Sequence, residues 1–282
     1  MQTFTLNNGV QIPAVGFGVF LIPNDGPTYE ATLAALKAGY RHIDTAAGYM
    51  NESDVGKAVK DSGIDRKEIF ITSKLWLQDY GYENAKKGIE NSLKALGTDY
   101  IDLYLLHQPY GDYLGAWKAL EEAYQEGKLR AIGISNITVN LWNKFKDGMS
   151  VMPAVNQVEF NPFTQQKALR QVMDENNIRL EAWYPLGHGN KDLLGNETIV
   201  SLAERYNKNP GQIILRWIYQ EGVISLPKST NPGRMAGNID IFDFELTDEE
   251  MASIRALDTG KGTHNPEDPA NETRLMGLKI HD

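Results

Sequence analysis

The chain has 282 residues and no cysteine, which excludes disulfides, thiolate metal sites and a cysteine nucleophile. Hydrophobic residues make up 41% and charged residues 23%, a balance typical of a globular protein with one large core. The net charge of −9 disfavours a general binder of nucleic acids, so any phosphate site must be a local cluster of cations.

The beginning of the chain gives no indication of export or membrane attachment. Residues 1–6 lack a basic region followed by an apolar run, so we do not expect a signal peptide. No segment approaches the roughly 18 apolar residues of a membrane span. We therefore expect a cytoplasmic protein without a membrane or nucleic-acid partner, and the absence of cysteine suits that compartment.

In chain order, the first predicted element is a β-hairpin, because Asn7-Asn8-Gly9 separates two short extended runs. Eight strands are expected after it, at 14–18, 42–44, 69–75, 100–107, 131–135, 154–158, 179–184 and 223–226. Apolar residues at helical spacing predict helices at 29–40, 52–62, 83–96, 114–126, 141–145, 165–176, 197–206, 210–220 and 232–239. A last helix opens at the capping box Thr247–Glu250, and the tail from Gly260 is expected to be loop.

This alternation runs without a linker or a change in composition, so we expect a single domain over residues 1–282. Strands as apolar as 101–106 suit a sheet covered by helices. The economical arrangement is an α/β fold, a (β/α)8 TIM barrel with an N-terminal hairpin and an additional C-terminal helix and loop. A doubly wound sheet is the alternative. We reject a Rossmann fold because the segment 16–21 begins like its glycine motif but ends in leucine and precedes no helix.

In a barrel of this kind, catalytic groups lie at the C-terminal ends of the strands. Those ends carry Asp44 with Tyr49 beyond it, Lys74, His107, Ser135, Asn136, Asn156, Gln157, Trp183, Tyr184, Lys228 and Ser229. Taken singly, each has an ordinary structural explanation, such as a solvated lysine or a hydrogen-bonded core histidine. Four ionisable groups of complementary type on consecutive strands would nevertheless meet at one rim.

Aspartate, tyrosine, lysine and histidine together suit proton donation to a developing alkoxide, which is half of carbonyl reduction. A phenol with its ordinary pKa of about 10 is a poor acid at neutral pH. We expect a neighbouring ammonium to lower that pKa and an aspartate to hold the lysine in its charged form. The histidine would position the carbonyl oxygen or assist the proton.

The chain has no hydride source of its own, so this chemistry needs a cofactor. An aromatic residue at the seventh strand end could stack on a nicotinamide ring. Hydrogen bonds to its carboxamide could come from Ser135, Asn136 and Gln157. The anticipated cation cluster is Lys228-Ser229-Thr230 with Arg234 at a short helix, which could bind the 2′-phosphate that distinguishes NADPH from NADH.

These features resemble the aldo-keto reductase superfamily along nearly the whole chain, and most closely its bacterial branch of diketogluconate, glyoxal and aldehyde reductases. Six stretches in register carry the resemblance: GYRHIDTA from Gly39, ITSKLW from Ile71, YIDLYLLH from Tyr100, GISN from Gly133, AVNQ from Ala154 and LPKS from Leu226.

The resemblance implies an NADPH-dependent reductase of aldehydes or ketones with a catalytic tetrad of Asp44, Tyr49, Lys74 and His107, in which Tyr49 is the general acid. It implies that NADP(H) is held by Ser135, Asn136, Gln157, Trp183, Lys228, Ser229, Arg234 and Asn238. Phe20, Trp76 and His107 would line the substrate pocket. The substrate would be a small carbonyl compound, such as a keto sugar or a glyoxal, and a monomer is the usual state of the family.

Three positions depart from the pattern of the family. Gln108 follows the histidine where many members have tryptophan, so we expect a more polar and open pocket wall. Tyr184 stands where serine usually follows the stacking aromatic, which places a large ring beside the cofactor channel. Gly237 replaces a glutamate that commonly helps to hold the adenosine, so the adenosine contacts are the least secure part of the site.

Two other classes of function were weighed, a non-catalytic cofactor-binding protein and a barrel hydrolase. A non-catalytic NADP(H)-binding regulatory or scaffold protein on the same fold is the alternative, although the complete tetrad argues against it. A retaining glycosidase would need two carboxylates about 5 Å apart, whereas the fourth strand ends in His107. Five scattered histidines argue against a metal hydrolase, and no metal site is expected. The loops after Trp76, after Tyr110 and beyond Gly260 are expected to shape the pocket. The sequence leaves open their conformations, the substrate and the strictness for NADPH over NADH.

Overall fold

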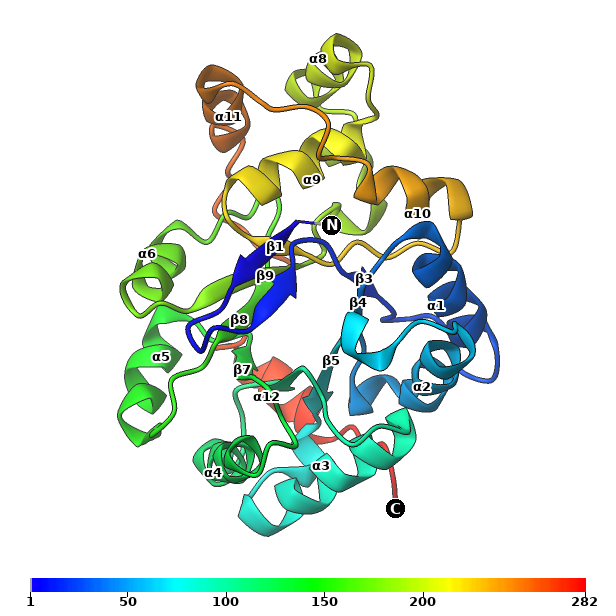
Figure 1. Cartoon of the computed structure of the whole chain (residues 1–282). Coiled ribbons are helices and arrows are strands. Elements are labelled where there is room, and N and C mark those ends of the chain that lie inside the picture. Colours follow the sequence, from blue (N-terminus) through cyan, green and yellow to red (C-terminus); the bar gives the residue numbers. More distant parts are fainter. Residues whose placement is uncertain (1) are drawn as a thin grey trace.

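Eight parallel strands form the centre of the protein in a computed structural model that describes residues 2–282 (Figure 1). They are β3 (Phe17–Gly18), β4 (His42–Asp44), β5 (Phe70–Leu75), β6 (Leu103–Leu106), β7 (Ile132–Ser135), β8 (Val155–Glu159), β9 (Arg179–Trp183) and β10 (Ile224–Ser225). Each strand pairs with the next in chain order. A parallel bridge between Val15 and Ser225 joins the first segment to the last, so the sheet closes and the predicted barrel is confirmed.

Helices surround the barrel and follow its strands (Figure 1). They are α1 (Pro27–Ala38), α2 (Glu52–Asp61), α3 (Tyr82–Leu96), α4 (Tyr113–Gln125), α5 (Val139–Phe145), α6 (Lys167–Glu175), α7 (Lys191–Leu194), α8 (Glu197–Tyr206), α9 (Pro210–Gln220), α10 (Pro232–Ile239), α11 (Asp248–Arg255) and α12 (Pro269–Met276). The predicted capping box is present, because Thr247 and Glu250 each bond the other's backbone N–H at the start of α11. Within residues 2–282, no helix has the length and apolar character needed to cross a bilayer.

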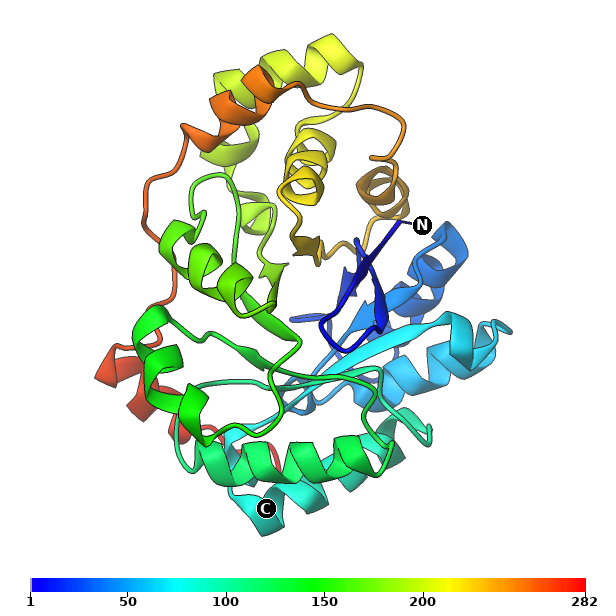
Figure 2. The same ribbon diagram turned by 60° about the vertical axis from the view of Figure 1, so that its left-hand side comes forward.

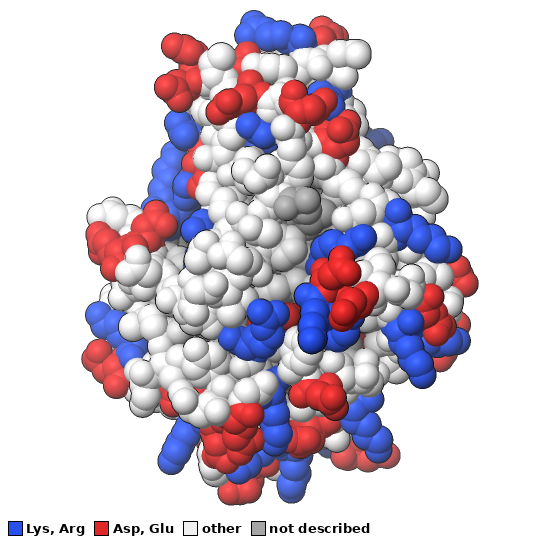
Figure 3. All heavy atoms as spheres, viewed as in Figure 1, with Lys and Arg blue, Asp and Glu red and all other residues white. Residues whose placement is uncertain are grey.

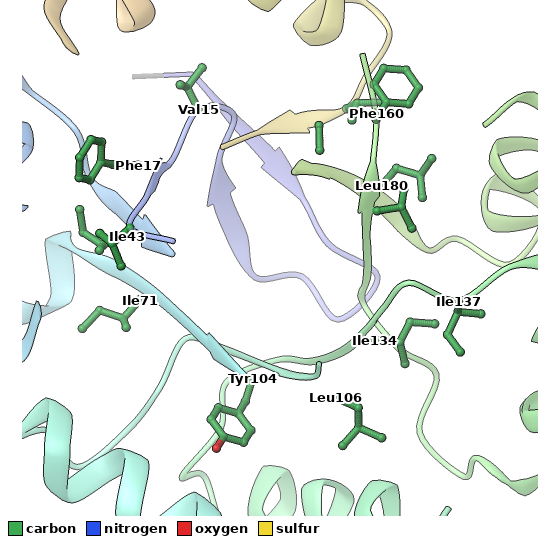
Figure 4. Close-up of a cluster of buried hydrophobic side chains, with 14 of the residues drawn as sticks. Val15, Phe17, Ile43, Ile71, Tyr104, Leu106, Ile134, Ile137, Phe160 and Leu180 are labelled. Carbon is green, nitrogen blue, oxygen red and sulfur yellow. The ribbon is translucent and has the colours of Figure 1, made fainter. Parts of the chain in front are cut away.

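The main core lies between the barrel and the helices. Side chains such as Ile43, Ile71, Tyr104 and Leu106 project outward from the strands toward that ring, and all four are fully buried (Figure 4). Alternation along each strand therefore sends apolar side chains outward and leaves the next residue facing the barrel interior. The interior near the C-terminal strand ends is consequently free to carry polar groups.

The predicted N-terminal hairpin is formed by β1 (Thr3–Thr5) and β2 (Gln11–Pro13). It covers the opposite end of the barrel (Figure 1). Its Leu6 and Ile12 are buried in a second, smaller cluster with interior residues that include Phe70, Leu105 and Val155. This apolar plug closes one end, so access to the interior is from the C-terminal ends of the strands. On the face seen in Figure 3, acidic and basic side chains are mixed and no large patch of one sign appears.

The tail beyond Gly260 differs from its prediction as loop. It contains α12, which begins after the cap Asp268, whose side chain accepts a hydrogen bond from the N–H of Ala270. From α11 the tail runs along the outside of the protein to α12, beside the C-terminal strand ends (Figure 2). The short helix α7 was also not predicted.

Candidate active site

A cavity of about 970 Å³ opens at the C-terminal ends of the barrel strands. Every side chain predicted for the site lines it, except Lys74. Lys74 is fully buried and lies behind the cavity wall in contact with Asp44 and Tyr49. The structure therefore brings the predicted residues together at one rim.

The Lys74 ammonium organises the centre of the site. Its Nζ donates to Asp44 Oδ1 at 2.7 Å, to the carbonyl oxygen of Thr45 at 2.9 Å and to the Tyr49 hydroxyl at 3.2 Å. An ammonium has three N–H donors, so this set uses all of them. The local sequence permits the arrangement because Gly48 has no side chain: a Cβ there would lie only 2.8 Å from the Trp76 ring.

Burial sets the protonation states of these groups. It would lower the pKa of Lys74, but the Asp44 carboxylate and the Tyr49 phenol outweigh that effect and raise it, so the ammonium persists. Burial raises the pKa of Asp44, and the Lys74 ammonium opposes that rise. Burial, together with the charge of Lys74, holds the pKa of His107 well below its usual value, so the imidazole is neutral.

The prediction that the pKa of Tyr49 would be lowered is wrong. Burial raises the pKa of Tyr49, and the Lys74 ammonium only partly opposes that rise. The phenol is therefore firmly protonated at neutral pH, which is the state that a proton donor requires. It can still protonate an alkoxide, because an alkoxide is a stronger base than a phenolate.

Aromatic rings surround the phenol. The His107 ring lies edge-to-face with Tyr49 at 5.4 Å between centroids and with Trp76 at 5.1 Å. The Phe20 ring lies 4.9 Å from Tyr49 and is 39% exposed, so it borders the mouth of the cavity. These rings flank the phenol ring, while its hydroxyl contacts the Lys74 ammonium.

Amides and a ring from strands β7 to β9 form the adjoining wall. The Trp183 Nε1 donates to Asn136 Oδ1 at 3.0 Å, and Ser135 Oγ donates to the carbonyl oxygen of Gln157 at 2.9 Å. Gln157 Nε2 donates to Asp44 Oδ2 at 2.8 Å. The wall is thereby linked by a hydrogen bond to Asp44 and, through it, to Lys74.

The predicted cation cluster lies at the far end of the cavity. Asn231 caps α10 by accepting from the N–H of Arg234, and Arg234 Nε donates to Ser229 Oγ at 3.3 Å. Lys228 and Arg234 form no ion pair with any residue in 2–282. A helix N-terminus with two unpaired cations is suited to a phosphate group. Asn238 is buried and also lines the cavity.

The three departures from the family pattern have definite positions. Gln108 Oε1 accepts from Asn136 Nδ2 at 3.3 Å, so its polar group is joined to the amide wall. Tyr184 has φ 53°, an unfavourable value for a residue other than glycine, and its ring packs on His188 at 4.2 Å. At Gly237, an added Cβ would meet only Asn209 Nδ2 at 3.5 Å, which is an ordinary contact.

Two groups of residues at the site were not identified from the sequence, although the segment beyond Gly260 was expected to shape the pocket. The tail contributes Thr263, His264, Arg274, Leu275, Leu278, Lys279 and Ile280 to the cavity wall. Its helix had a sequence signal in Asp268-Pro269, a capping residue followed by proline at the first helical position. Beneath the rim, Glu181 and His42 are fully buried. The sequence did contain a signal for this second group, because a glutamate stands between Leu180 and Ala182 in an apolar strand.

Comparison with known proteins gives consistent matches. The family model described as "Aldo/keto reductase family" matches residues 22–259. The chain is 48% identical over 257 residues to "Glyoxal reductase" of Bacillus subtilis, covering 91% of this chain and 92% of that protein. It is 44% identical to "Morphine 6-dehydrogenase" of Pseudomonas putida, with 90% of both covered.

Solved structures agree with these matches. The aldo-keto reductase MGS-M4, from a Medee basin deep-sea metagenome library, superimposes with a TM-score of 0.90 at 44% identity, covering 93% of this chain and 97% of that one. A mutant of Gox0644 in complex with NADPH gives a TM-score of 0.88 at 38% identity, covering 94% and 97%.

Proposed function

This chain belongs to the aldo/keto reductase family, and from that premise we propose that it reduces aldehydes or ketones to alcohols with NADPH. The observation that carries the proposal is the placement of the Tyr49 hydroxyl 3.2 Å from a buried Lys74 ammonium and beside the neutral His107 ring. Such a group can deliver a proton to the oxygen of a carbonyl compound as negative charge develops on it.

The residues of the cavity fit the cofactor. NADPH supplies a hydride when it is bound. Trp183 would pack against its nicotinamide ring, while Ser135, Asn136 and Gln157 would hydrogen-bond the carboxamide. Lys228, Ser229, Arg234 and Asn238 would hold the adenosine end. Support comes from Lys228 and Arg234, which form no ion pair within residues 2–282, and from the Gln157 Oε1 atom, which accepts no hydrogen bond from the same residues.

Within the catalytic group, each residue has a distinct role. Tyr49 donates its proton to the substrate oxygen. Lys74 stabilises the phenolate that this leaves, because its ammonium is already hydrogen-bonded to the phenol oxygen. Asp44 keeps Lys74 charged and in place. The neutral His107 imidazole donates a hydrogen bond that orients the carbonyl oxygen.

The substrate class that we propose is a small carbonyl compound, such as a glyoxal or a keto sugar. Phe20, Trp76 and His107 would contact it at the mouth and floor of the cavity. We further propose that the 282 residues act as one domain, as a monomer and in the cytoplasm. Light scattering of the purified protein tests the monomer, which a stable dimer would contradict.

The direct test of the function is NADPH consumption by the purified protein across simple aldehydes, glyoxals, diketones and keto sugars. We expect turnover with at least one of these groups, accompanied by formation of the corresponding alcohol. Tight NADPH binding without turnover on any member of the panel would contradict a reductase and favour a non-catalytic cofactor-binding protein.

A further inference from the structure

A second carboxyl group lies directly beneath the catalytic rim. Glu181 is in the middle of β9 and is 0% exposed. The alternation of side chains along a strand places it on the same face as Trp183, one layer deeper in the barrel. The proton-donating step proposed for Tyr49 does not involve it, and a buried carboxyl group of this kind is unfavourable unless hydrogen bonds compensate for its burial.

The partner of Glu181 is Gln157 on the neighbouring strand, directly opposite in the register of β8 and β9. Gln157 Nε2 donates to Glu181 Oε2 at 2.7 Å and to Asp44 Oδ2 at 2.8 Å. An amide nitrogen has two hydrogens, so these two bonds use both. The other end of the amide, Oε1, accepts no hydrogen bond from the described residues, and Gln157 lines the cavity.

We propose that Glu181 is a positioning residue: together with Asp44 it fixes the orientation of the Gln157 amide, so that Oε1 faces the cavity as an acceptor for the carboxamide of the nicotinamide. This inference rests on the proposed NADPH-dependent function. It assigns Glu181 no contact with the cofactor or the substrate, and its effect passes through Gln157 alone.

The charge balance of the barrel interior is compatible with this role. Lys74, the one buried lysine among residues 2–282, is already paired with Asp44. Burial and then the nearby Asp44 raise the pKa of Glu181 to about 8, so the carboxyl is mostly neutral at pH 7. A neutral carboxyl still accepts a hydrogen bond, so the orientation of Gln157 is the same in either state. Burial lowers the pKa of the adjacent His42 to about 3, so this ring adds no charge.

Loss of Glu181 would leave one buried N–H of Gln157 without a partner. The amide could then turn to find another acceptor, and Oε1 would no longer be held toward the cavity. Only ligands that contain the nicotinamide carboxamide should therefore bind more weakly. Binding of the adenosine end would depend on Lys228, in the segment before α10, and on Arg234, in the first turn of α10. Neither residue shares a hydrogen bond with Glu181.

The experiment compares two ligands on the whole protein by fluorescence titration. NADP⁺ carries the nicotinamide, and 2′-phospho-ADP-ribose lacks it. The variants are Glu181→Met, which fills the space without an acceptor, and Glu181→Gln, which retains an acceptor oxygen. We expect Glu181→Met to weaken NADP⁺ binding about tenfold, the order of one lost hydrogen bond, and to leave 2′-phospho-ADP-ribose unchanged. Glu181→Gln should restore NADP⁺ binding.

Further variants separate positioning from a general structural effect. In a Gln157→Met background, Glu181→Met should weaken NADP⁺ no further, because its effect passes through Gln157. Unchanged NADP⁺ binding by Glu181→Met would overturn the inference. Equal weakening of NADP⁺ and 2′-phospho-ADP-ribose binding would also overturn it, because that result indicates a damaged fold and not the positioning of Gln157. If Glu181→Met cannot be purified, weak NADP⁺ binding by Glu181→Gln with intact 2′-phospho-ADP-ribose binding would likewise overturn it. Failure of the wild-type protein to bind NADP⁺ would instead contradict the proposed function.

Discussion

The two walls of the cavity are held in different ways. The wall at the strand ends is built from buried side chains on neighbouring strands, where Lys74, Asp44 and Gln157 are joined by hydrogen bonds of 2.7 and 2.8 Å. The opposite wall comes from the tail, which lies beyond residue 259, the end of the family match. The groups proposed to transfer the proton are thus held by the barrel strands, while a separate segment would shape the space for the substrate.

The tail is attached through a small number of contacts. Trp76 Nε1 donates to the carbonyl oxygen of Leu278 at 2.9 Å, and Gln78 Oε1 accepts from the N–H of Ile280 at 2.8 Å. His281 bonds Asp79 at 2.8 Å. These three anchors belong to the segment that follows β5. Other strand ends hold the tail as well, because Thr138 Oγ1 donates to Glu267 and the N–H of Thr263 donates to Glu159. We expect changes in the barrel wall to affect catalysis, and changes in the tail to affect substrate choice.

The largest effect is expected from Lys74→Met. Removing one partner of a buried ion pair leaves the Asp44 carboxylate uncompensated, which should lower the free energy of unfolding by about 3–5 kcal/mol. Carbonyl reduction should also be lost. The matched double variant Lys74→Met/Asp44→Asn should regain most of the stability without regaining activity. Urea unfolding and NADPH consumption measure the two quantities. If Lys74→Met were as stable as wild type, the ion pair between Lys74 and Asp44 would not stabilise the barrel wall.

The next largest effect concerns cofactor choice. Arg234→Ala should weaken NADPH binding about 10- to 100-fold, the order of a lost charge-assisted hydrogen bond, and should affect NADH much less. Arg274→Ala removes a cation from the tail wall and serves as the control, with no change in the preference for NADPH over NADH. Titration of each variant with both cofactors gives the result. Equal weakening of NADPH and NADH by Arg234→Ala would place the 2′-phosphate elsewhere.

A further effect should depend on pH. A glutamate has an ordinary pKa of 4.5, and in the fold burial and then Asp44 raise the pKa of Glu181 to about 8. The folded protein therefore binds more protons than the unfolded chain within that window, so this group makes stability fall as the pH rises from about 4.5 to about 8. Glu181→Gln has no titrating group at this position. Its stability relative to wild type should therefore increase as the pH rises from about 4.5 to about 8.

Urea unfolding of both proteins at several pH values tests this prediction. Burial lowers the pKa of His42 to about 3, but this contribution is common to the two proteins and cancels in their difference. A difference in stability that does not change with pH would mean that Glu181 titrates normally inside the barrel.

The smallest effect is expected from Gln78→Ala, which removes one anchor of the tail. The loss of exposed hydrogen bonds should shift KM for larger carbonyl substrates by no more than about fivefold, because such contacts contribute about 1 kcal/mol or less. The rate at saturating substrate and the affinity for NADPH should stay unchanged. A large fall in the rate with the smallest aldehyde would show that the tail also supports the catalytic group, and would remove the distinction between the two walls.

Much of the fold and of the barrel wall could be predicted because both depend on local patterns. Alternating strands and helices specify a barrel, and parallel strands bring their C-terminal ends to one rim, so residues as distant as Asp44 and Gln157 are placed together by topology. Complementary residue types at those ends then indicate the chemistry. None of these steps requires knowledge of how the loops fold.

The remaining features depend on tertiary structure. The tail is polar and rich in proline and asparagine, and its position depends on contacts with Trp76 and Gln78, which lie 202 residues earlier in the chain than their partners. The direction of the Tyr49 pKa shift depends on the degree of burial, which a sequence pattern does not give. Glu181 was visible as a charged residue in an apolar strand, but its partner Gln157 is identified only by the register of β8 and β9.

The most direct test of the account is the rate of carbonyl reduction by Tyr49→Phe, measured at saturating NADPH alongside the affinity for NADPH. Tyr184→Phe, which removes another hydroxyl at the cavity, is the matched control. Loss of the general acid should slow reduction about 10²- to 10⁴-fold, while NADPH affinity and the rate of the control remain close to wild type. Reduction at the wild-type rate by Tyr49→Phe, with an unchanged product, would contradict the assignment of Tyr49 as the proton donor.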